Sequence, residues 1–190
     1  AARLSYQEVQ AVLDGVLEDA GDATPYQSEL LLMAELCKKR AQIRAARGSL
    51  ELDLPEALVE LDAKGRPLSL GIYPRHQSNR IIEEFMLVAN ECVGRFCGER
   101  NLPVLYRVHL PPAAQKLDAV FALIPGAQAS SGNAKSMEPR DMQKLLEQAR
   151  GAPNATLVSK LLLRSLSRAE YVGEDRGHFG LACTQYLHFT

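Results

Sequence analysis

The chain has 190 residues, of which 46% are hydrophobic and 24% charged, and its formal net charge is −1. This length and composition are typical of one globular domain and exclude a disordered segment. The near-neutral charge lacks the basic excess that is usual in nucleic-acid-binding domains. No apolar run approaches the roughly 20 residues of a membrane-spanning helix, so we expect no membrane partner.

The four cysteines show no spacing that predicts a metal site or a disulfide framework. They form neither a Cys-x-x-Cys motif nor Cys/His pairs at zinc spacing. We interpret them as reduced core thiols, which are typical of a cytoplasmic protein. They are Cys37, Cys92, Cys97 and Cys183.

Apolar periodicity and turn residues divide the chain into helices separated by short strands. Ser5 and Glu8 have the spacing of a capping box, which predicts the start of the first helix. Two short apolar runs around a Gly-containing turn predict a β-hairpin, and the small residues of 126–136 predict a flexible loop. The order of elements predicts an α+β (mixed α/β) fold, helix-rich with a mixed sheet. The expected helices are 5–13, 25–46, 79–100, 113–123, 139–148 and 155–166; the expected strands are 58–61, 67–73 and 104–110, with short strands or turns at 171 and 179–182.

Three arginines form a stripe along the second half of the helix expected at 25–46. Arg40, Arg44 and Arg47 are spaced i, i+4, i+7, which places them on one side of a helix. One interpretation is a solvated face near a helix C-terminus, where positive charge is favourable. The alternative is a patch that faces phosphate groups.

The helix expected from residue 79 carries adjacent glutamates, Glu83 and Glu84, in a half that is apolar nearly all round. A buried carboxylate needs a cation, a donor or a ligand. Glu83 shares a stripe with Asn90, and this pair would suit a hydroxyl-rich ligand such as ribose. The alternative is a narrow solvated strip, on which Glu91 pairs with Arg95. The core face of the helix is predicted to comprise Ile82, Phe85, Met86, Ala89, Cys92, Val93 and Phe96.

Six stretches occur in an order and at spacings that are similar to those of one enzyme family. They are ARLSYQEVQ (2–10), RGSLELDLPE (47–56), NRIIEEFMLVAN (79–90), LPVLYRVHLPP (102–112), LLLRSLSRAEY (161–171) and GHFGLACTQYLHFT (177–190). Over nearly its whole length the chain resembles part of the catalytic domain, called the RNB domain, of the ribonuclease II and ribonuclease R family. We therefore expect residues 1–190 to be the central-to-C-terminal part of one incomplete RNB-type domain.

The resemblance implies a processive exoribonuclease that hydrolyses single-stranded RNA from its 3′ end to nucleoside 5′-monophosphates. Such an enzyme uses Mg²⁺, with one ion activating water and another stabilising the leaving oxygen. RNA bases stack on aromatic side chains, so the sequence of the RNA matters little. The family also implies a monomer.

The resemblance further implies RNA contacts for residues that match the family motifs. Tyr6 matches a tyrosine that helps to distinguish RNA from DNA, and either Glu83 or Glu84 matches its acidic partner. His178 and Phe179 match a Gly-His-Phe-Gly-Leu element near the end of the RNA channel.

Several of these residues have a structural role as the alternative. Tyr6 would pack beside the helix cap, and Phe179 would belong to the core. Arg107 would contact a phosphate or pair with a neighbouring acid. His109 is interpreted as a structural histidine. Asn90, beside Glu83, completes the set of RNA-binding candidates.

The chain departs from the family pattern at both ends. In the family, metal-binding aspartates cluster upstream of the RLSY stretch, whereas the aspartates here are scattered; an arginine that follows HFT in the family would lie beyond Thr190. Because the chain also begins without Met, we expect a piece of a longer protein that holds no catalytic residue or metal ligand and is inactive alone. The alternative is a non-catalytic RNA-binding or regulatory RNB-like module.

Overall fold

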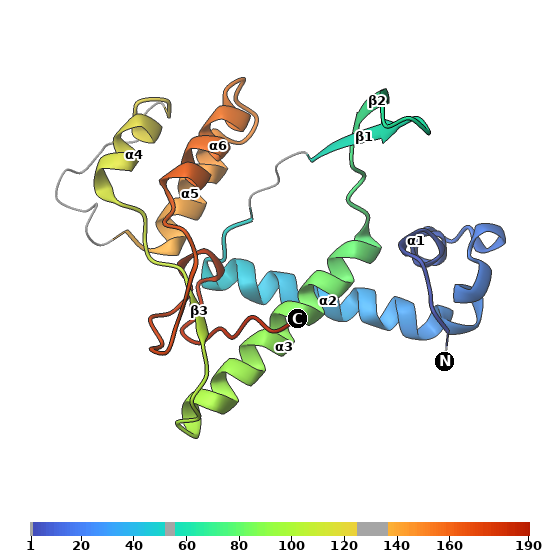
Figure 1. Cartoon of the computed structure of the whole chain (residues 1–190), viewed down its shortest axis with the longest axis horizontal. Helices are drawn as coiled ribbons and strands as arrows, with labels where there is room; N and C mark the ends of the chain where they lie inside the picture. The colour runs from blue at the N-terminus through green and yellow to red at the C-terminus, as the bar shows by residue number, and fades with distance from the viewer. Residues whose placement is uncertain (1, 52–55, 125–136) are drawn as a thin grey trace. The chain divides into compact units, whose positions relative to one another are not determined.

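The computed structural model describes residues 2–51, 56–124 and 137–190 (Figure 1). The chain forms two compact units, Ala1–Arg40 with Asp53–Phe85 and Ala41–Leu52 with Met86–Thr190. Two long helices, α2 (Gln27–Arg47) and α3 (Gln77–Glu99), contribute residues to both units. The predicted loop at 126–136 lies outside the described residues. No helix in the described part of the chain is long and apolar enough to span a membrane.

The first unit begins with α1 (Tyr6–Asp14), which starts at the predicted capping box. Ser5 Oγ accepts a hydrogen bond from the Glu8 amide, and the Glu8 carboxylate accepts one from the Ser5 amide. Gly15, in the left-handed region at φ 78°, ends the helix. Short 3₁₀ turns, η1 (Leu17–Asp19) and η2 (Gly21–Tyr26), lead to α2. The small core beneath them comprises Val12, Ala20, Ala23 and Leu30.

The predicted hairpin is present as β1 (Ala57–Leu61) and β2 (Pro67–Ile72), an antiparallel pair. The Asp62 carboxylate accepts hydrogen bonds from the amides of Lys64 and Arg66, which fixes the turn. Both strands are exposed along their whole length. The stability of the hairpin therefore depends on its turn and on the backbone hydrogen bonds between its two strands, since it has no buried face among the described residues.

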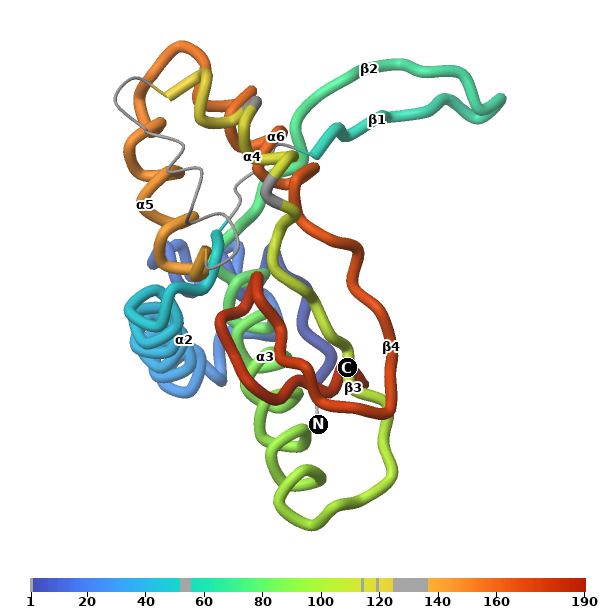
Figure 2. The backbone as a smooth tube through the Cα atoms, turned by 90° about the vertical axis from the view of Figure 1, so that its left-hand side faces the viewer, coloured from blue at the N-terminus to red at the C-terminus, as the bar shows by residue number. Residues whose placement is uncertain are grey.

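The core of the second unit is a layer of three helices, α4 (Ala114–Phe121), α5 (Pro139–Ala149) and α6 (Ala155–Ser165) (Figures 1 and 2). Each helix contributes apolar residues that are almost wholly buried, which is the main stabilising contribution expected from this unit. They are Leu117, Val120, Met142, Val158 and Leu162.

Two short strands connect this helical layer to α3. The strands β3 (Tyr106–Val108) and β4 (Glu170–Val172) pair antiparallel, with Arg107 opposite Tyr171. The chain then forms an isolated parallel bridge between His109 and His178 and a 3₁₀ turn, η4 (Phe179–Leu181). The helix-rich α+β class is confirmed. Within the described ranges, however, the strands form two separate antiparallel pairs, so the expected mixed sheet is reduced to this single parallel bridge.

The predicted core face of α3 is wrong for most of its residues. Ile82, Met86, Val93 and Phe96 are between 36% and 51% exposed, and Cys92 is exposed as well. The buried residues divide between two nearly opposite sides of the helix: Ser78, Ile81 and Glu84 in its first half, and Asn90, Gly94 and Cys97 in its second. In the second half, small side chains explain the difference, because a Cβ on Gly94 would lie only 3.1 Å from the Leu187 amide nitrogen. The C-terminal segment therefore packs where α3 has the least side-chain bulk, although that face is not the most apolar.

Candidate nucleic-acid interface

Tyr6 lies at the first position of α1 and is 45% exposed. Its ring lines a cavity of about 400 Å³ in the first unit, together with Tyr26, Leu30, Ile81 and Ile82. Most of this lining is apolar, so the cavity suits a flat or apolar group rather than an ion. The structure places Tyr6 beside an open site and not in the core, which is compatible with the predicted RNA contact.

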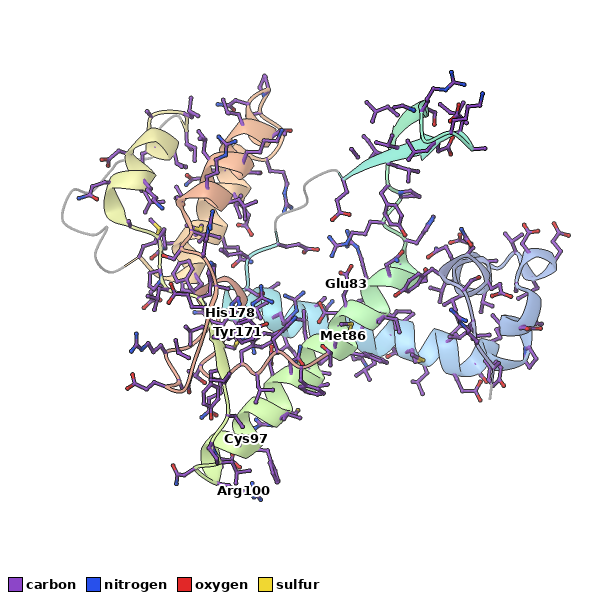
Figure 3. The ribbon with its side chains drawn as sticks, viewed as in Figure 1. Glu83, Met86, Cys97, Arg100, Tyr171 and His178 are labelled. Atoms are coloured by element: carbon purple, nitrogen blue, oxygen red, sulfur yellow. The ribbon has the colours of Figure 1, made fainter. Side chains whose placement is uncertain are left out.

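The two adjacent glutamates of α3 lie in different environments. Glu83 is at the surface, where its carboxylate forms an ion pair with the guanidinium of Arg75 (Figure 3). Glu84 is only 5% exposed. Only Glu83 therefore presents a carboxylate that a ligand could reach, and Ile82 next to it lines the cavity of Tyr6.

Asn90 does not pair with Glu83. Its side chain is 1% exposed, and its amide group donates to Tyr186 Oη at 3.0 Å and to Thr190 Oγ1 at 2.9 Å. Its Oδ1 accepts from the amides of Phe189 and Thr190, both at 3.3 Å. Because these bonds use both donors and both lone pairs of the amide, Asn90 holds the C-terminal segment and has nothing left for a ribose hydroxyl.

The pairing of Glu91 with Arg95, offered as an alternative from the sequence, is not what the structure shows. Glu91 accepts two hydrogen bonds from Arg47, at 2.6 and 3.1 Å, and Arg47 also donates to the carbonyl of Leu181 at 3.0 Å. This bidentate geometry is the strong form of the arginine–carboxylate pair. Arg47 therefore joins α2 to α3 and η4 and does not face phosphate.

Four aromatic side chains gather beside β3, and we call them the ring cluster: His109, His178, Tyr186 and His188. Successive ring centroids are 5.0, 5.1 and 5.8 Å apart. Tyr186 lies within hydrogen-bond distance of His188 Nδ1, at 3.1 Å. Tyr186 Oη also accepts a hydrogen bond from the Asn90 side chain, so the tyrosine hydroxyl links Asn90 to His188.

His109 and His178 are held neutral by their hydrogen bonds and their burial. His109 Nδ1 accepts from the Gly180 amide and its Nε2 lies 2.8 Å from the Ser167 carbonyl; His178 Nδ1 accepts from the Leu181 amide. Burial lowers the pKa of His109. Burial, followed by the charges of His109 and Arg107, lowers the pKa of His178 to about 4. The structural interpretation of His109 agrees with these contacts, and His178 has the same character.

Phe179 belongs to the core. It is 7% exposed and joins the apolar cluster of α4, α5 and α6. A stacking platform for RNA needs an exposed ring face, so the prediction of an RNA contact for Phe179 is wrong.

Arg107 projects from β3 on the side of the ring cluster. Its guanidinium carbon lies 5.9 Å from the centroid of the Tyr171 ring, its cross-strand partner. Its Nε is buried and has no hydrogen-bond partner within the described ranges. The pairing with a neighbouring acid, one of the two alternatives for Arg107, is not seen there.

Tyr171, Tyr186 and His188 did not emerge from sequence reasoning as site residues. The signal for the last two is weak: three of the four residues in the segment 186–189 carry a ring. No group of three or more His, Cys, Asp or Glu side chains suitable for a metal ion occurs in the parts of the chain that the structure describes. These residues therefore do not fit a magnesium site.

The geometry describes a helix-rich α+β protein with a surface tyrosine and glutamate in one unit and an arginine beside aromatic rings in the other. The sequence profile of the RNB domain matches residues 1–190. The chain belongs to the RNB domain family.

Known relatives agree with this assignment. The chain is 36% identical to ribonuclease R of Aquifex aeolicus over 189 residues, which are 100% of this chain and 27% of that protein. It is 32% identical to ribonuclease R of Escherichia coli over 191 residues, 100% of this chain and 23% of that protein. A structure of Mycoplasma genitalium RNase R in complex with double-stranded RNA matches with a TM-score of 0.86 and 26% identity, covering 98% of this chain and 33% of that one. The chain thus spans about a quarter of the curated relatives named here.

Proposed function

We propose that this chain is part of a processive exoribonuclease that hydrolyses single-stranded RNA from the 3′ end to nucleoside 5′-monophosphates. The observation that carries the proposal is the RNB profile match, which extends over all 190 residues. The relatives named ribonuclease R support the substrate class. The enzyme acts as a monomer in the cytoplasm.

In this proposal the residues of the first unit recognise the sugar. Tyr6 lines an open, mainly apolar cavity, and the Glu83 carboxylate is reachable on the helix that flanks it. A carboxylate accepts a hydrogen bond from a ribose 2′-hydroxyl, which DNA lacks. Glu83, rather than the buried Glu84, is therefore assigned to this contact. His178 acts indirectly, by capping η4 and supporting the segment that follows.

Mg²⁺ would supply the activated water of the hydrolysis. Because the described residues bring together no suitable ligand set, we derive no step of the reaction through the ion and assign its ligands to residues outside this chain. Accordingly, the chain alone is expected to bind RNA without cleaving it.

A chimera tests the catalytic part of the proposal. Residues 1–190 replace the matching 189-residue segment of Aquifex aeolicus ribonuclease R, and product release from end-labelled single-stranded RNA is followed by chromatography with Mg²⁺ present. We expect mononucleotides from the chimera and none from the isolated chain. Mononucleotide release by the isolated chain, or a folded chimera without activity, would contradict the proposal.

Selectivity for the sugar tests the assigned residues. In the chimera, Tyr6→Ala and Glu83→Gln are each expected to narrow the difference in cleavage rate between RNA and the matching DNA. Tyr26→Ala, which alters another ring of the same cavity, is the matched control and keeps that difference.

A non-catalytic RNA-binding module is the second candidate function. It shares the RNB profile match over residues 1–190 and differs from the enzyme in lacking the metal ligands, which would lie outside this chain. A chimera that binds RNA with full affinity but releases no mononucleotides would support this candidate over the enzyme.

A further inference from the structure

Among the described residues, no acidic side chain compensates the charge of Arg107. The side chain is half-buried, its Nε is shielded from solvent, and that atom has no hydrogen-bond partner there. No described carboxylate forms an ion pair with it either. A shielded polar atom without a partner is unfavourable, so an anion bound to the guanidinium would supply the partner that Nε lacks.

The surroundings of Arg107 are aromatic and neutral rather than acidic. Its charge contributes to the lowered pKa of His109, His178 and His188, after the effect of their burial. Arg107 therefore lies close to three imidazoles that remain uncharged and cannot neutralise it. These rings form a face of low polarity, in which the attraction of an anion is screened less than in water.

The acidic side chains of the adjoining loop are engaged elsewhere. Glu174 forms an ion pair with Arg176, and the Asp175 carboxylate accepts a hydrogen bond from the Gly177 amide. Glu170, the next residue of β4, is paired with Val108 in the strand register, so its side chain alternates to the face opposite Arg107. None of the three occupies the space over the guanidinium.

Tyr171 adds a stacking surface to this cation. Tyr171, labelled in Figure 3, lies opposite Arg107 in the β3–β4 register, is 54% exposed, and has its ring within cation–π distance of the guanidinium. An exposed ring next to an unpaired arginine is the combination by which proteins hold single-stranded nucleic acid, with the base on the ring and the phosphate on the cation. His188, whose Nδ1 lies 3.1 Å from Tyr186 Oη, adds a further imidazole ring near this face.

We propose that Arg107 and Tyr171 form a binding site for one nucleotide unit of single-stranded RNA, with the phosphodiester on Arg107 and the base stacked on Tyr171. This site rests on the proposed function but involves other residues than Tyr6 and Glu83: β3 and β4 belong to one unit, whereas Tyr6 and Glu83 belong to the other.

Binding of a fluorescent decauridylate to this chain, followed by anisotropy over a range of salt concentrations, tests the site. Arg107→Met is expected to weaken binding about 5- to 100-fold and to reduce the slope of log affinity against log salt by about 0.7, the contribution of one phosphate contact. Arg164→Met removes the same charge from an exposed position on α6 and is the matched control, expected to change affinity less than about 2-fold.

The base contact is tested with an abasic decamer of the same length. Tyr171→Ala is expected to weaken binding of the decauridylate about 5- to 100-fold and to leave binding of the abasic decamer unchanged. Tyr171→Phe keeps the ring and is expected to bind both as the wild-type chain does.

Thermal unfolding separates a binding role of Arg107 from a structural one. Removal of an uncompensated charge is expected to leave the Tm of Arg107→Met equal to or above that of the wild-type chain. A lower Tm with unchanged RNA affinity would overturn the proposal, since Arg107 would then be a structural residue.

If the wild-type chain binds no RNA, the RNA contacts of the proposed function fail. Binding of inorganic phosphate then tests the anion site at Arg107 separately. The ring protons of His188 are followed by NMR during a phosphate titration. A saturable shift that is lost in Arg107→Met supports the anion site, and the absence of a shift overturns it.

Discussion

Asn90 and Thr190, one hundred residues apart, are joined by a hydrogen bond of 2.9 Å between the asparagine Nδ2 and the threonine Oγ1. The same asparagine binds Tyr186 Oη and the backbone amides of the last two residues. One buried amide thus fixes the position of the whole C-terminal segment on α3. The ring cluster depends on this attachment, because two of its four rings belong to that segment.

Asn90→Ala is expected to lower the free energy of unfolding by about 2–4 kcal/mol, since it leaves several buried donors and acceptors without partners. Urea denaturation followed by circular dichroism measures the loss. Asn154→Ala removes an asparagine with one hydrogen bond, to the Leu123 carbonyl, and should cost about 1 kcal/mol. Equal losses for the two variants would contradict the special role of Asn90.

Glu91→Gln is expected to destabilise the chain by about 1–3 kcal/mol, because the bidentate pair with Arg47 is mostly shielded from water. Arg95→Met is the matched control. The sequence offered Arg95 as one possible partner of Glu91, but the structure gives that role to Arg47, so this variant should change the unfolding free energy by less than about 0.5 kcal/mol. A larger loss of unfolding free energy for Arg95→Met would indicate that Glu91 pairs with Arg95 instead.

Gly94→Ala is expected to destabilise the chain by about 1–2 kcal/mol even though alanine favours helices. The added Cβ would approach the backbone of Leu187 to 3.1 Å and that of Gln185 to 3.3 Å, and backbone cannot swing aside as a side chain does. Gly71→Ala, where nothing lies within 4 Å, is the control. The prediction fails if thermal unfolding gives Gly94→Ala a Tm at or above that of the wild-type chain.

The chain is expected to lose stability in acid below pH 6.5. The pKa of His178 falls from 6.5 to about 4 on folding, so between these values the unfolded state binds a proton that the folded state does not, and unfolding becomes easier as the pH falls. The full stabilisation is present above pH 6.5, and about 3 kcal/mol of it is lost by pH 4. Urea midpoints across this range measure the effect. His178→Asn keeps an acceptor for the Leu181 amide without a titrating ring and should flatten the profile.

The cysteines are expected to react unequally with Ellman's reagent. Cys92 is exposed, whereas Cys37 and Cys97 are buried. Burial, followed by the charge of Glu91, raises the pKa of the half-buried Cys183 to about 12, so its reactive thiolate is scarce at neutral pH. One thiol should react at once in the native chain and all four in denaturant. Cys92→Ser should abolish the fast phase, and a fast phase that survives this substitution would contradict the exposure of Cys92.

The sequence alone determined the local elements and the family. Helix caps and turns are short-range patterns, so the capping box at Ser5 and the hairpin turn at Asp62 were predictable and are present. The motif order identified the RNB family, and the profile match confirms it. The family motifs also pointed to Tyr6 and to the Glu83–Glu84 pair as RNA contacts, a prediction that stays open; between the two glutamates, only the burial of Glu84 in the structure favours Glu83.

Only the tertiary structure decided which face of each element is buried and which polar groups meet. The apolar stripe of α3 predicted the wrong core face, and in the second half of the helix the reason is that the C-terminal segment packs on Gly94 and Gly98. Likewise, the partners of Glu91, Asn90 and Arg107 lie between 44 and 100 residues away in the sequence. Such contacts depend on chain segments brought together by packing, and no periodicity within one helix or strand records them.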